Sequence, residues 1–287
     1  MSRPHSGDET RPMVDELIRV GAAELPSRRG IPEPRREARW LLAAAAGVSE
    51  AWLRLHPAAK IPAADADRYL TWIARRKAGE PAEHLTGSCT FWGRSFHVSP
   101  AVLIPRPETE LIVELALQLE QPAASRVLDV GTGSGCLAVT LAAERPGWSV
   151  FAVDRSLAAL CIAQANGEAL EVNVDWFLAD LATAAGGPFD LVTANLPYLP
   201  TRWMADLPIE VRHDPPMALD GGADGLDPVR RLLGQLGRVL AQGGVCLLEI
   251  AEGQADEVRR SARQCGLDPF VSRRDVGGCE RVVGVRR

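Results

Sequence analysis

The segment DVGTGSG at residues 129–135 has the composition of a loop that binds a ligand through its backbone. It overlaps the end of the apolar run 125–130 and the start of a helical pattern over 135–144, so we expect it to join a strand to a helix N-terminus. Glycines at such a junction allow a tight turn and a close approach to a ligand. Dinucleotide sites have the spacing GxGxxG, whereas this segment reads GxGxG, which favours S-adenosylmethionine. The residues of this loop that we predict to bind the cofactor are Gly131, Thr132, Gly133, Ser134 and Gly135.

Acidic residues end the next two predicted strands. Asp154 lies about twenty residues beyond Gly131, the interval at which a carboxylate meets ribose hydroxyls in this kind of sheet. Asp180 and Leu181 end the third strand, where we expect them beside the adenine ring, with Leu181 as a cofactor contact. Two plainer interpretations compete with these. The glycines and Asp154 could serve only as loop residues, and Asp180 could be an ordinary helix N-cap.

The fourth predicted strand ends at the sequence NLPY, residues 195–198. The Asn195 side-chain oxygen and the Leu196 carbonyl would supply two acceptors for one NH2 group, and Pro197 would hold Leu196 in an extended conformation. Tyr198 would supply a flat face for a planar substrate. We predict that these four residues bind the substrate and carry the catalysis, and that Asn195 also contacts the cofactor. The alternative is an ordinary proline turn after a strand.

This set of acceptors suits methyl transfer to a planar amide or amino group. Transfer from a sulfonium requires a nitrogen in line with the methyl carbon and the departing sulfur, and positioning is the main catalytic device. An amide nitrogen is a poor nucleophile because its lone pair is delocalised. Fixed acceptors for its protons would raise its electron density as positive charge develops, so no general base and no metal are needed beforehand.

Extended and helical patterns alternate from residue 108 onward. The strands have little polar alternation, as strands covered on both faces require. Right-handed crossovers between them predict an α/β fold with a doubly wound, mostly parallel sheet, and the tail 280–287 is expected to add an edge strand. The predicted strands are 125–130, 149–153, 173–178, 189–194 and 244–250, and the predicted helices are 108–120, 135–144, 156–170, 227–241 and 253–265.

The N-terminal part has a different pattern. Apolar residues at three- and four-residue spacing predict helices over 13–25, 33–47 and 65–78. Residues 79–107 are rich in Gly, Pro and aromatic residues, which predicts a short hairpin and no helix. The predicted domains are a helical domain over 1–78, a hairpin linker over 79–107 and a catalytic domain over 108–287.

The composition excludes several classes of protein. A formal net charge of -5 gives no general attraction to phosphate backbones, so we expect no direct nucleic-acid binding. The 6 cysteines form no CxxC pair and have no His at metal-ligand spacing, so we expect buried or half-buried thiols and no metal site. No run approaches the roughly 18 consecutive apolar residues of a membrane span, and no signal peptide is recognisable, so we expect a cytoplasmic protein.

Six segments together resemble the HemK/PrmC family, the N5-glutamine methyltransferases that modify the Gly-Gly-Gln motif of peptide-chain release factors. They are PAEHLTG at 81–87, FWGRSFHV at 91–98, LIPRPETELIVE at 103–114, DVGTGSG at 129–135, ALDGGADGLD at 218–227 and LLEIAEGQ at 247–254. LIPRPETE is the most family-specific of them, and the similarity covers nearly the whole chain. The resemblance implies a class I S-adenosylmethionine-dependent methyltransferase fold with a small N-terminal helical domain, and release factors as the protein substrate. We also expect a monomer.

The resemblance also assigns roles to residues. Gly131 to Gly135, Asp154, Leu181 and Asn195 would bind S-adenosylmethionine, and residues 195–198 would hold the glutamine side chain. Arg106 and Glu108 would shape the rim of the site. The helical domain of the family helps to grip the protein substrate, although a solvated helix face is the plainer interpretation of each basic residue there. The basic candidates are Arg35, Arg36, Arg39, Arg75, Arg76 and Lys77.

Three positions depart from the family pattern. Leu196 stands where the family usually has a second proline, and the form NLPY also occurs in ribosomal-RNA adenine dimethyltransferases. His84 replaces a common Tyr, and Leu181 stands where some members carry Trp. Three alternatives therefore stay open: an adenine-N6 methyltransferase acting on RNA or DNA, a noncatalytic cofactor-binding adaptor, and a methyltransferase for another protein or a small amide.

Overall fold

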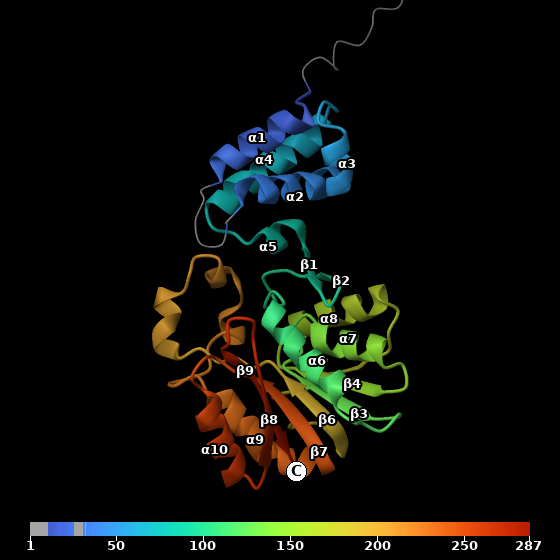
Figure 1. Cartoon of the computed structure of the whole chain (residues 1–287), viewed down its shortest axis with the longest axis vertical. Helices are drawn as coiled ribbons and strands as arrows, with labels where there is room; N and C mark the ends of the chain where they lie inside the picture. The colour runs from blue at the N-terminus through green and yellow to red at the C-terminus, as the bar shows by residue number, and fades with distance from the viewer. Residues whose placement is uncertain (1–10, 26–30, 32) are drawn as a thin grey trace, which may run out of the picture. The chain divides into compact units, whose positions relative to one another are not determined.

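The computed structural model describes residues 11–25, 31 and 33–287 of the chain. It contains two compact units (Figure 1). The first holds the N-terminal part up to Gly87 together with Pro208–His213, and the second holds Ser88–Leu207 and Asp214–Arg287. The division falls inside the segment 79–107 that we expect to be a linker, and the predicted domain boundaries themselves stay a prediction.

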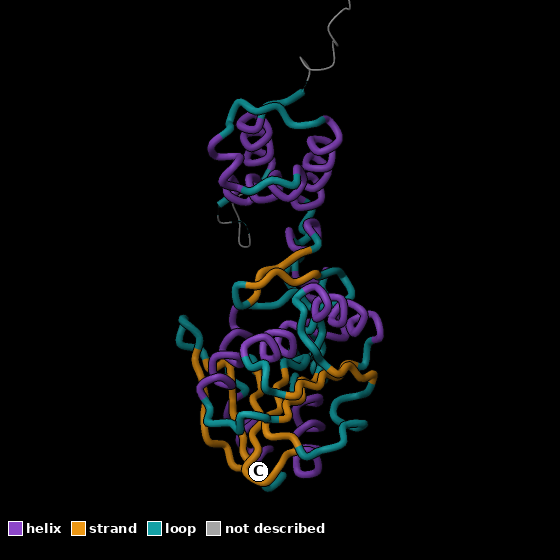
Figure 2. Tube along the Cα trace, turned by 90° about the vertical axis from the view of Figure 1, so that its right-hand side faces the viewer, coloured by secondary structure: helices purple, strands orange, loops and turns teal. Residues whose placement is uncertain are grey.

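The first unit is built from helices, which Figure 2 draws in purple and joined by teal loops. Helices α1 (Val14–Glu24), α2 (Pro34–Ala46) and α4 (Ala63–Lys77) lie where the apolar spacing predicts them. Their buried faces meet in one core, in which the Tyr69 hydroxyl donates to the Leu17 carbonyl at 3.1 Å. A further helix, α3 (Glu50–Leu55), is too short for a helical period to be read from the sequence, and Ser49 caps it.

The prediction of a segment without helix over 79–107 is wrong in its first part. Residues Ala82–Thr86 form α5, a single turn that starts after Pro81 and ends at Gly87, whose φ is +72°. A proline before the first turn and a glycine after the last are compatible with a short helix, although both residues favour loops. The predicted hairpin follows as β1 (Ser88–Phe91) and β2 (Arg94–His97).

The second unit contains a seven-stranded sheet in the order β5-β4-β3-β6-β7-β9-β8. Neighbouring strands are parallel from β5 to β7 and antiparallel from β7 to β8. The predicted α/β fold with a doubly wound, mostly parallel sheet is therefore confirmed. The strands are β3 (Arg126–Val130), β4 (Ser149–Asp154), β5 (Asp175–Leu178), β6 (Phe189–Ala194), β7 (Leu240–Glu249), β8 (Asp268–Arg274) and β9 (Glu280–Arg286).

Helices cover both faces of this sheet (Figure 1). One face packs against α6 (Glu110–Gln118) and α7 (Cys136–Glu144), with α8 (Leu157–Ala169) beside α7, and the other packs against α9 (Asp227–Val239) and α10 (Ala255–Gln264). Successive residues of β3 pack into opposite cores: Val127 packs into the core with α6 and α7, and Leu128 packs into the core with α9 and α10. Short 3-10 helices lie at Pro107–Thr109, Thr201–Asp206, Val211–His213 and Pro216–Ala218.

Three expectations about exposure and order need correction. The tail strand β9 is not an edge strand, because β8 pairs with its outer side. Strand β5 is an edge strand with Phe177 and Leu178 exposed, so its apolar composition does not mean coverage on both faces. The cysteines are free, but Cys161 and Cys265 are exposed rather than buried.

Within the described ranges, no helix combines the length and the apolar character needed to cross a bilayer. The same residues contain no group of three or more His, Cys, Asp or Glu side chains arranged to hold a metal ion.

Candidate active site

A pocket lies at the carboxyl ends of β3, β4, β5 and β6, all within the second unit. Open α/β sheets bind ligands at this edge, at the strand where the strand order reverses. In this sheet that strand is β3, which lies between β4 and β6. The predicted cofactor and substrate residues that line it are Gly131, Thr132, Gly133, Ser134, Asp154, Leu181, Asn195, Leu196 and Pro197. Gly135 and Tyr198 are outside this lining. Gly135 belongs to the backbone of the glycine loop, and Tyr198 makes hydrogen bonds to residues around the site.

The glycine loop has a conformation that other residues would resist. Gly131, Gly133 and Gly135 have φ values of +72°, +56° and +81°. A Cβ on Gly131 would lie 2.9 Å from Leu196 Cδ2, and a Cβ on Gly135 would lie 3.0 Å from the Cβ of Ala163 in α8. The first glycine therefore lets the loop approach the NLPY segment, and the third lets α7 pack against α8.

Asp154 connects the loop to the end of β4. Its Oδ2 accepts from the Gly133 N–H at 2.9 Å, and its Oδ1 accepts from the Ser156 N–H at 2.8 Å. The backbone N–H groups of Gly131 and Thr132 both donate to the Val153 carbonyl, at 2.8 and 3.0 Å. The half-buried carboxylate is thus fixed at the pocket wall, with lone pairs left for hydroxyl donors.

The segment after β5 forms another wall of the pocket. Leu181 has φ +52°, a left-handed conformation that is rare for a large side chain, and it is buried at the pocket. Asp180 pairs with Arg231 of α9, and both residues line the pocket. The N–H of Ala182 donates to Gln235 Oε1 at 2.9 Å, which holds the strained turn against α9.

Asn195 is oriented by a residue that the sequence did not single out. Its Nδ2 donates to the hydroxyl of Thr109 at 3.0 Å. Thr109 is buried, lines the pocket and belongs to the LIPRPETE segment. Because Thr109 engages the amide nitrogen, the Oδ1 at the other end of the Asn195 amide group is left as an acceptor.

Tyr198 contacts a buried carboxyl group. Its hydroxyl donates to Oε1 of Glu249, the last residue of β7, at 3.4 Å. Burial raises the pKa of Glu249 to about 7, and the hydroxyls of Thr109 and Tyr198 oppose the rise. Burial also raises the pKa of Tyr198, so its phenol stays protonated. Sequence reasoning could have found Glu249 as the lone acidic residue that follows the apolar run 245–248.

A second carboxyl group lies under the glycine loop. Asp129, in β3, accepts from the Thr193 hydroxyl of β6 at 2.8 Å, and burial raises its pKa to about 6. The contact joins the ends of the two strands that carry the glycine loop and the NLPY segment.

The ALDGGADGLD segment holds the backbone of NLPY. Leu199 N–H donates to the Leu219 carbonyl at 3.0 Å, and Gly221 N–H donates to the Leu199 carbonyl at 2.8 Å. A Cβ on Gly221 would lie 2.7 Å from the Pro197 carbonyl oxygen, and one on Gly225 would lie 2.2 Å from the Tyr198 carbonyl oxygen. These glycines are required by close backbone contact with the candidate substrate-binding residues.

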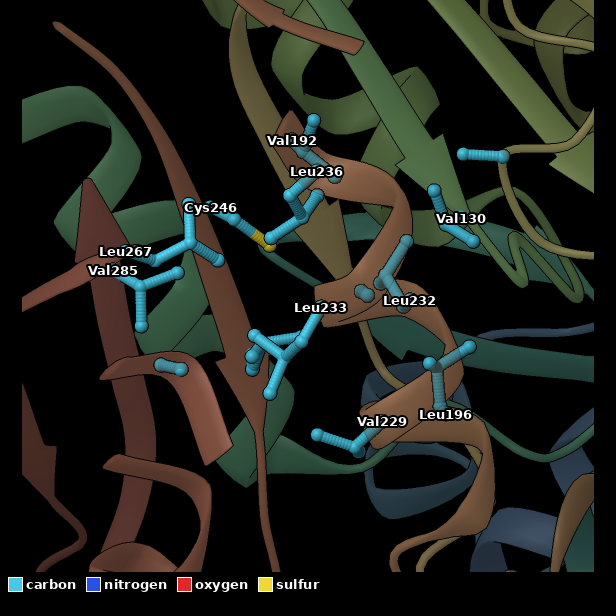
Figure 3. Packing of buried hydrophobic residues seen from close by; sticks show 14 of the residues in the cluster. Val130, Val192, Leu196, Val229, Leu232, Leu233, Leu236, Cys246, Leu267 and Val285 are labelled. Atoms are coloured by element: carbon cyan, nitrogen blue, oxygen red, sulfur yellow. The ribbon is translucent and has the colours of Figure 1, made fainter. Parts of the chain in front are cut away.

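The side chain of Leu196 belongs to the protein core. Leu196 is 4% exposed and packs with residues of β3 and α9, among them Val130 and Val229 (Figure 3). A leucine at this position therefore contributes buried apolar surface, while its backbone remains part of the pocket wall.

The two expected rim residues do not line the pocket. Arg106 instead pairs with Asp214 at 2.6 Å, and the fully buried carboxylate of Asp214 also accepts from the Ile104 N–H at 3.3 Å. These contacts fix the LIPRPETE segment, and with it the backbone that precedes Thr109. Arg106 thus holds this segment from outside the pocket, and Glu108 is also outside the pocket lining.

The basic candidates of the helical unit are not alike. Arg76 is buried and pairs with Glu37 and with Glu210 of the segment Pro208–His213, so it is a structural residue and not a surface contact. Arg75 pairs with Glu80, Lys77 with Glu24, and Arg35 with Asp15, while Arg36 is exposed and Arg39 is half-buried.

The fold matches solved methyltransferases. A methyltransferase from Pyrococcus furiosus is similar with a TM-score of 0.53 at 17% identity, over 77% of this chain and 96% of that chain. The 16S rRNA N2 G1207 methyltransferase of T. thermophilus, solved in complex with AdoMet and guanosine, is similar with a TM-score of 0.50 at 20% identity, over 70% and 49%. The sheet order, the glycine loop and these similarities define a class I methyltransferase fold.

Sequence comparison narrows this class. Residues 16–87 match the PrmC N-terminal domain, and residues 109–205 match the methyltransferase small domain. A release factor glutamine methyltransferase from Rhodospirillum rubrum is 37% identical over 99% of this chain and 88% of its own length. One from Koribacter versatilis is 42% identical over 89% and 92%. The chain belongs to the release factor glutamine methyltransferase family.

Proposed function

We propose that the chain transfers a methyl group from S-adenosylmethionine to the side-chain amide nitrogen of the Gly-Gly-Gln glutamine of peptide-chain release factors. The observation that carries the proposal is the orientation of Asn195. Its amide nitrogen is held by Thr109 at the pocket that the glycine loop also lines, so its oxygen is available to a substrate NH2 group.

The pocket fits the cofactor. Three glycines with positive φ form a cradle in which a Cβ on Gly131 would meet Leu196, and the fixed carboxylate of Asp154 suits two ribose hydroxyls. Residues 131–135, Asp154, Leu181 and Asn195 would hold S-adenosylmethionine, which supplies the methyl group from an electrophilic sulfonium.

The residues of NLPY would place the glutamine amide. Asn195 Oδ1 and the Leu196 carbonyl accept its two N–H protons, Pro197 keeps the backbone extended, and Tyr198 packs against its plane. Acceptors that are fixed before the reaction lower the free energy of the transition state, in which the amide nitrogen gains positive charge. The rigid attachment of this backbone to Gly221, Gly225 and Gln254, whose Nε2 donates to the Tyr198 carbonyl at 2.9 Å, supports such a role.

The protein partner would be recognised partly by the helical unit. Among its basic residues, Arg36 is the best candidate for a contact, because it is exposed while Arg76 is buried and several others are paired with carboxylates. We expect the chain to act as a monomer in the cytoplasm, where release factors work, and not to bind nucleic acid, given its net charge of -5.

The test is methyl transfer from labelled S-adenosylmethionine to three substrates: a release factor, the same factor with its Gly-Gly-Gln glutamine replaced, and ribosomal RNA. We expect label on the first alone, and its loss in Asn195→Ala. Asn173→Ala, at an exposed asparagine outside the pocket, is the matched control and should keep full activity. Label on RNA adenine would show that the alternative adenine-N6 activity is correct.

A further inference from the structure

Thr109 is placed where it can decide which end of the Asn195 amide faces the substrate. It ends the 3-10 helix Pro107–Thr109, and its N–H donates to the Arg106 carbonyl at 3.1 Å. Its side chain is 2% exposed, and a β-branched side chain in a helical turn has few rotamers available. The hydroxyl that meets Asn195 Nδ2 at 3.0 Å is therefore at a fixed point in the pocket wall.

The two ends of an amide group have opposite hydrogen-bonding properties. With Nδ2 engaged by Thr109, Asn195 presents Oδ1, an acceptor that suits a substrate NH2 group. If the amide turned over, Nδ2 would face the substrate instead, and two donors would meet. The site then would lose one of its two acceptors for the amide that is to be methylated.

We propose that Thr109 is a positioning residue for methyl transfer: its hydroxyl oxygen accepts from Asn195 and thereby fixes Oδ1 as the acceptor for the substrate amide. The proposal rests on the proposed function of the NLPY segment. Thr109 does not touch the reacting atoms, and it acts through Asn195.

Glu249 favours the same orientation. A threonine hydroxyl can offer its lone pair or its proton to Asn195, and only the lone pair selects the orientation observed. The Thr109 hydroxyl opposes the rise in the pKa of Glu249, as a donor to that carboxyl does. A hydroxyl that offers its proton to Glu249 keeps its oxygen lone pair for Asn195.

Two substitutions separate this role from packing. Thr109→Val keeps the shape and removes the hydroxyl, whereas Thr109→Ser keeps the hydroxyl. We expect Thr109→Val to lower kcat for release factor methylation by about 10- to 100-fold with little change in the Kd of S-adenosylmethionine. Thr109→Ser should retain most of the activity. The matched control is Thr140→Val in α7, another buried threonine, whose Oγ1 has no hydrogen-bond partner among the described residues, and it should leave kcat unchanged.

Equal activity of Thr109→Val and wild type, or equal losses in the Val and Ser variants, would overturn the proposal. A second measurement requires neither a Thr109 variant nor turnover. In the 15N–1H spectrum of the wild-type protein, the side-chain amide signals of Asn195, identified by their loss in Asn195→Ala, should include one slowly exchanging proton. Fast exchange of both protons would overturn the proposal. Absence of glutamine methylation by the wild type would instead refute the proposed function, and the amide signals would still decide the role of Thr109.

Discussion

Replacement of Asp154 by asparagine should weaken S-adenosylmethionine binding without unfolding the second unit. The carboxylate accepts from two backbone N–H groups, those of Gly133 and Ser156, with a separate oxygen for each. Asparagine has one side-chain oxygen, so one N–H would face an NH2 group, and the acceptor for the ribose hydroxyls would lose its charge. Hydrogen bonds to charged groups contribute about 1.5–3 kcal/mol. We therefore expect the Kd, measured by isothermal titration calorimetry, to rise by about 10- to 150-fold.

The matched control is Asp175→Asn, which removes a charge from the exposed start of β5 outside the pocket. It should leave the Kd unchanged, and thermal unfolding should show that both variants are folded. A Kd of Asp154→Asn equal to that of Asp175→Asn would refute the reasoning, because Asp154 would then serve only to anchor the loop.

Three further predictions concern the residues around NLPY. Glu249→Gln should remove pH-dependent stability. Because the pKa of Glu249 rises from 4.5 to about 7 on folding, its contribution of about 3 kcal/mol is complete below pH 4.5 and is lost as the pH rises through 7. In urea unfolding, the stability of wild type relative to the variant should thus be greater at pH 5 than at pH 8. Gly221→Ala should abolish most activity, since its Cβ would lie 2.7 Å from the Pro197 carbonyl oxygen, whereas Gly234→Ala, which meets open space in α9, should leave activity intact and raise the melting temperature. Leu196→Ala should cost about 2–4 kcal/mol in urea unfolding because it empties a core position, and Leu196→Pro should retain measurable methyl transfer because the backbone carbonyl is kept.

The sequence was sufficient for the parallel part of the sheet, because apolar runs alternate with helical periods from 125–130 to 244–250. It was insufficient for the antiparallel edge. Strand β8, DPFVSRR, is half-exposed and rich in charge, so it has no apolar run to mark it. The position of β9 between β7 and β8 depends on which strands pair, and an apolar pattern does not specify that.

The candidate site residues that were predicted from the sequence are those that come directly after a predicted strand. Gly131 and Asn195 come together because β3 and β6 are neighbours and parallel, which the predicted topology already implies. Thr109 and Glu249 were not predicted, since Thr109 reaches the site from the 3-10 helix Pro107–Thr109 and Glu249 from the end of β7, and neither belongs to the two loops that carry the predicted residues. Gly221 and Gly225 belong to the ALDGGADGLD segment. Only the structure shows why glycine is needed at these positions, which is close contact with two backbone carbonyls.

The most direct test of the central claim is the position of the transferred methyl group. A release factor treated with the protein and S-adenosylmethionine should be digested and its Gly-Gly-Gln peptide sequenced by tandem mass spectrometry, with the Asn195→Ala protein as the parallel reaction. We expect one methyl group, on the side-chain nitrogen of that glutamine, and none with Asn195→Ala. A methyl group on any other residue, or an unchanged yield with Asn195→Ala, would contradict the central claim.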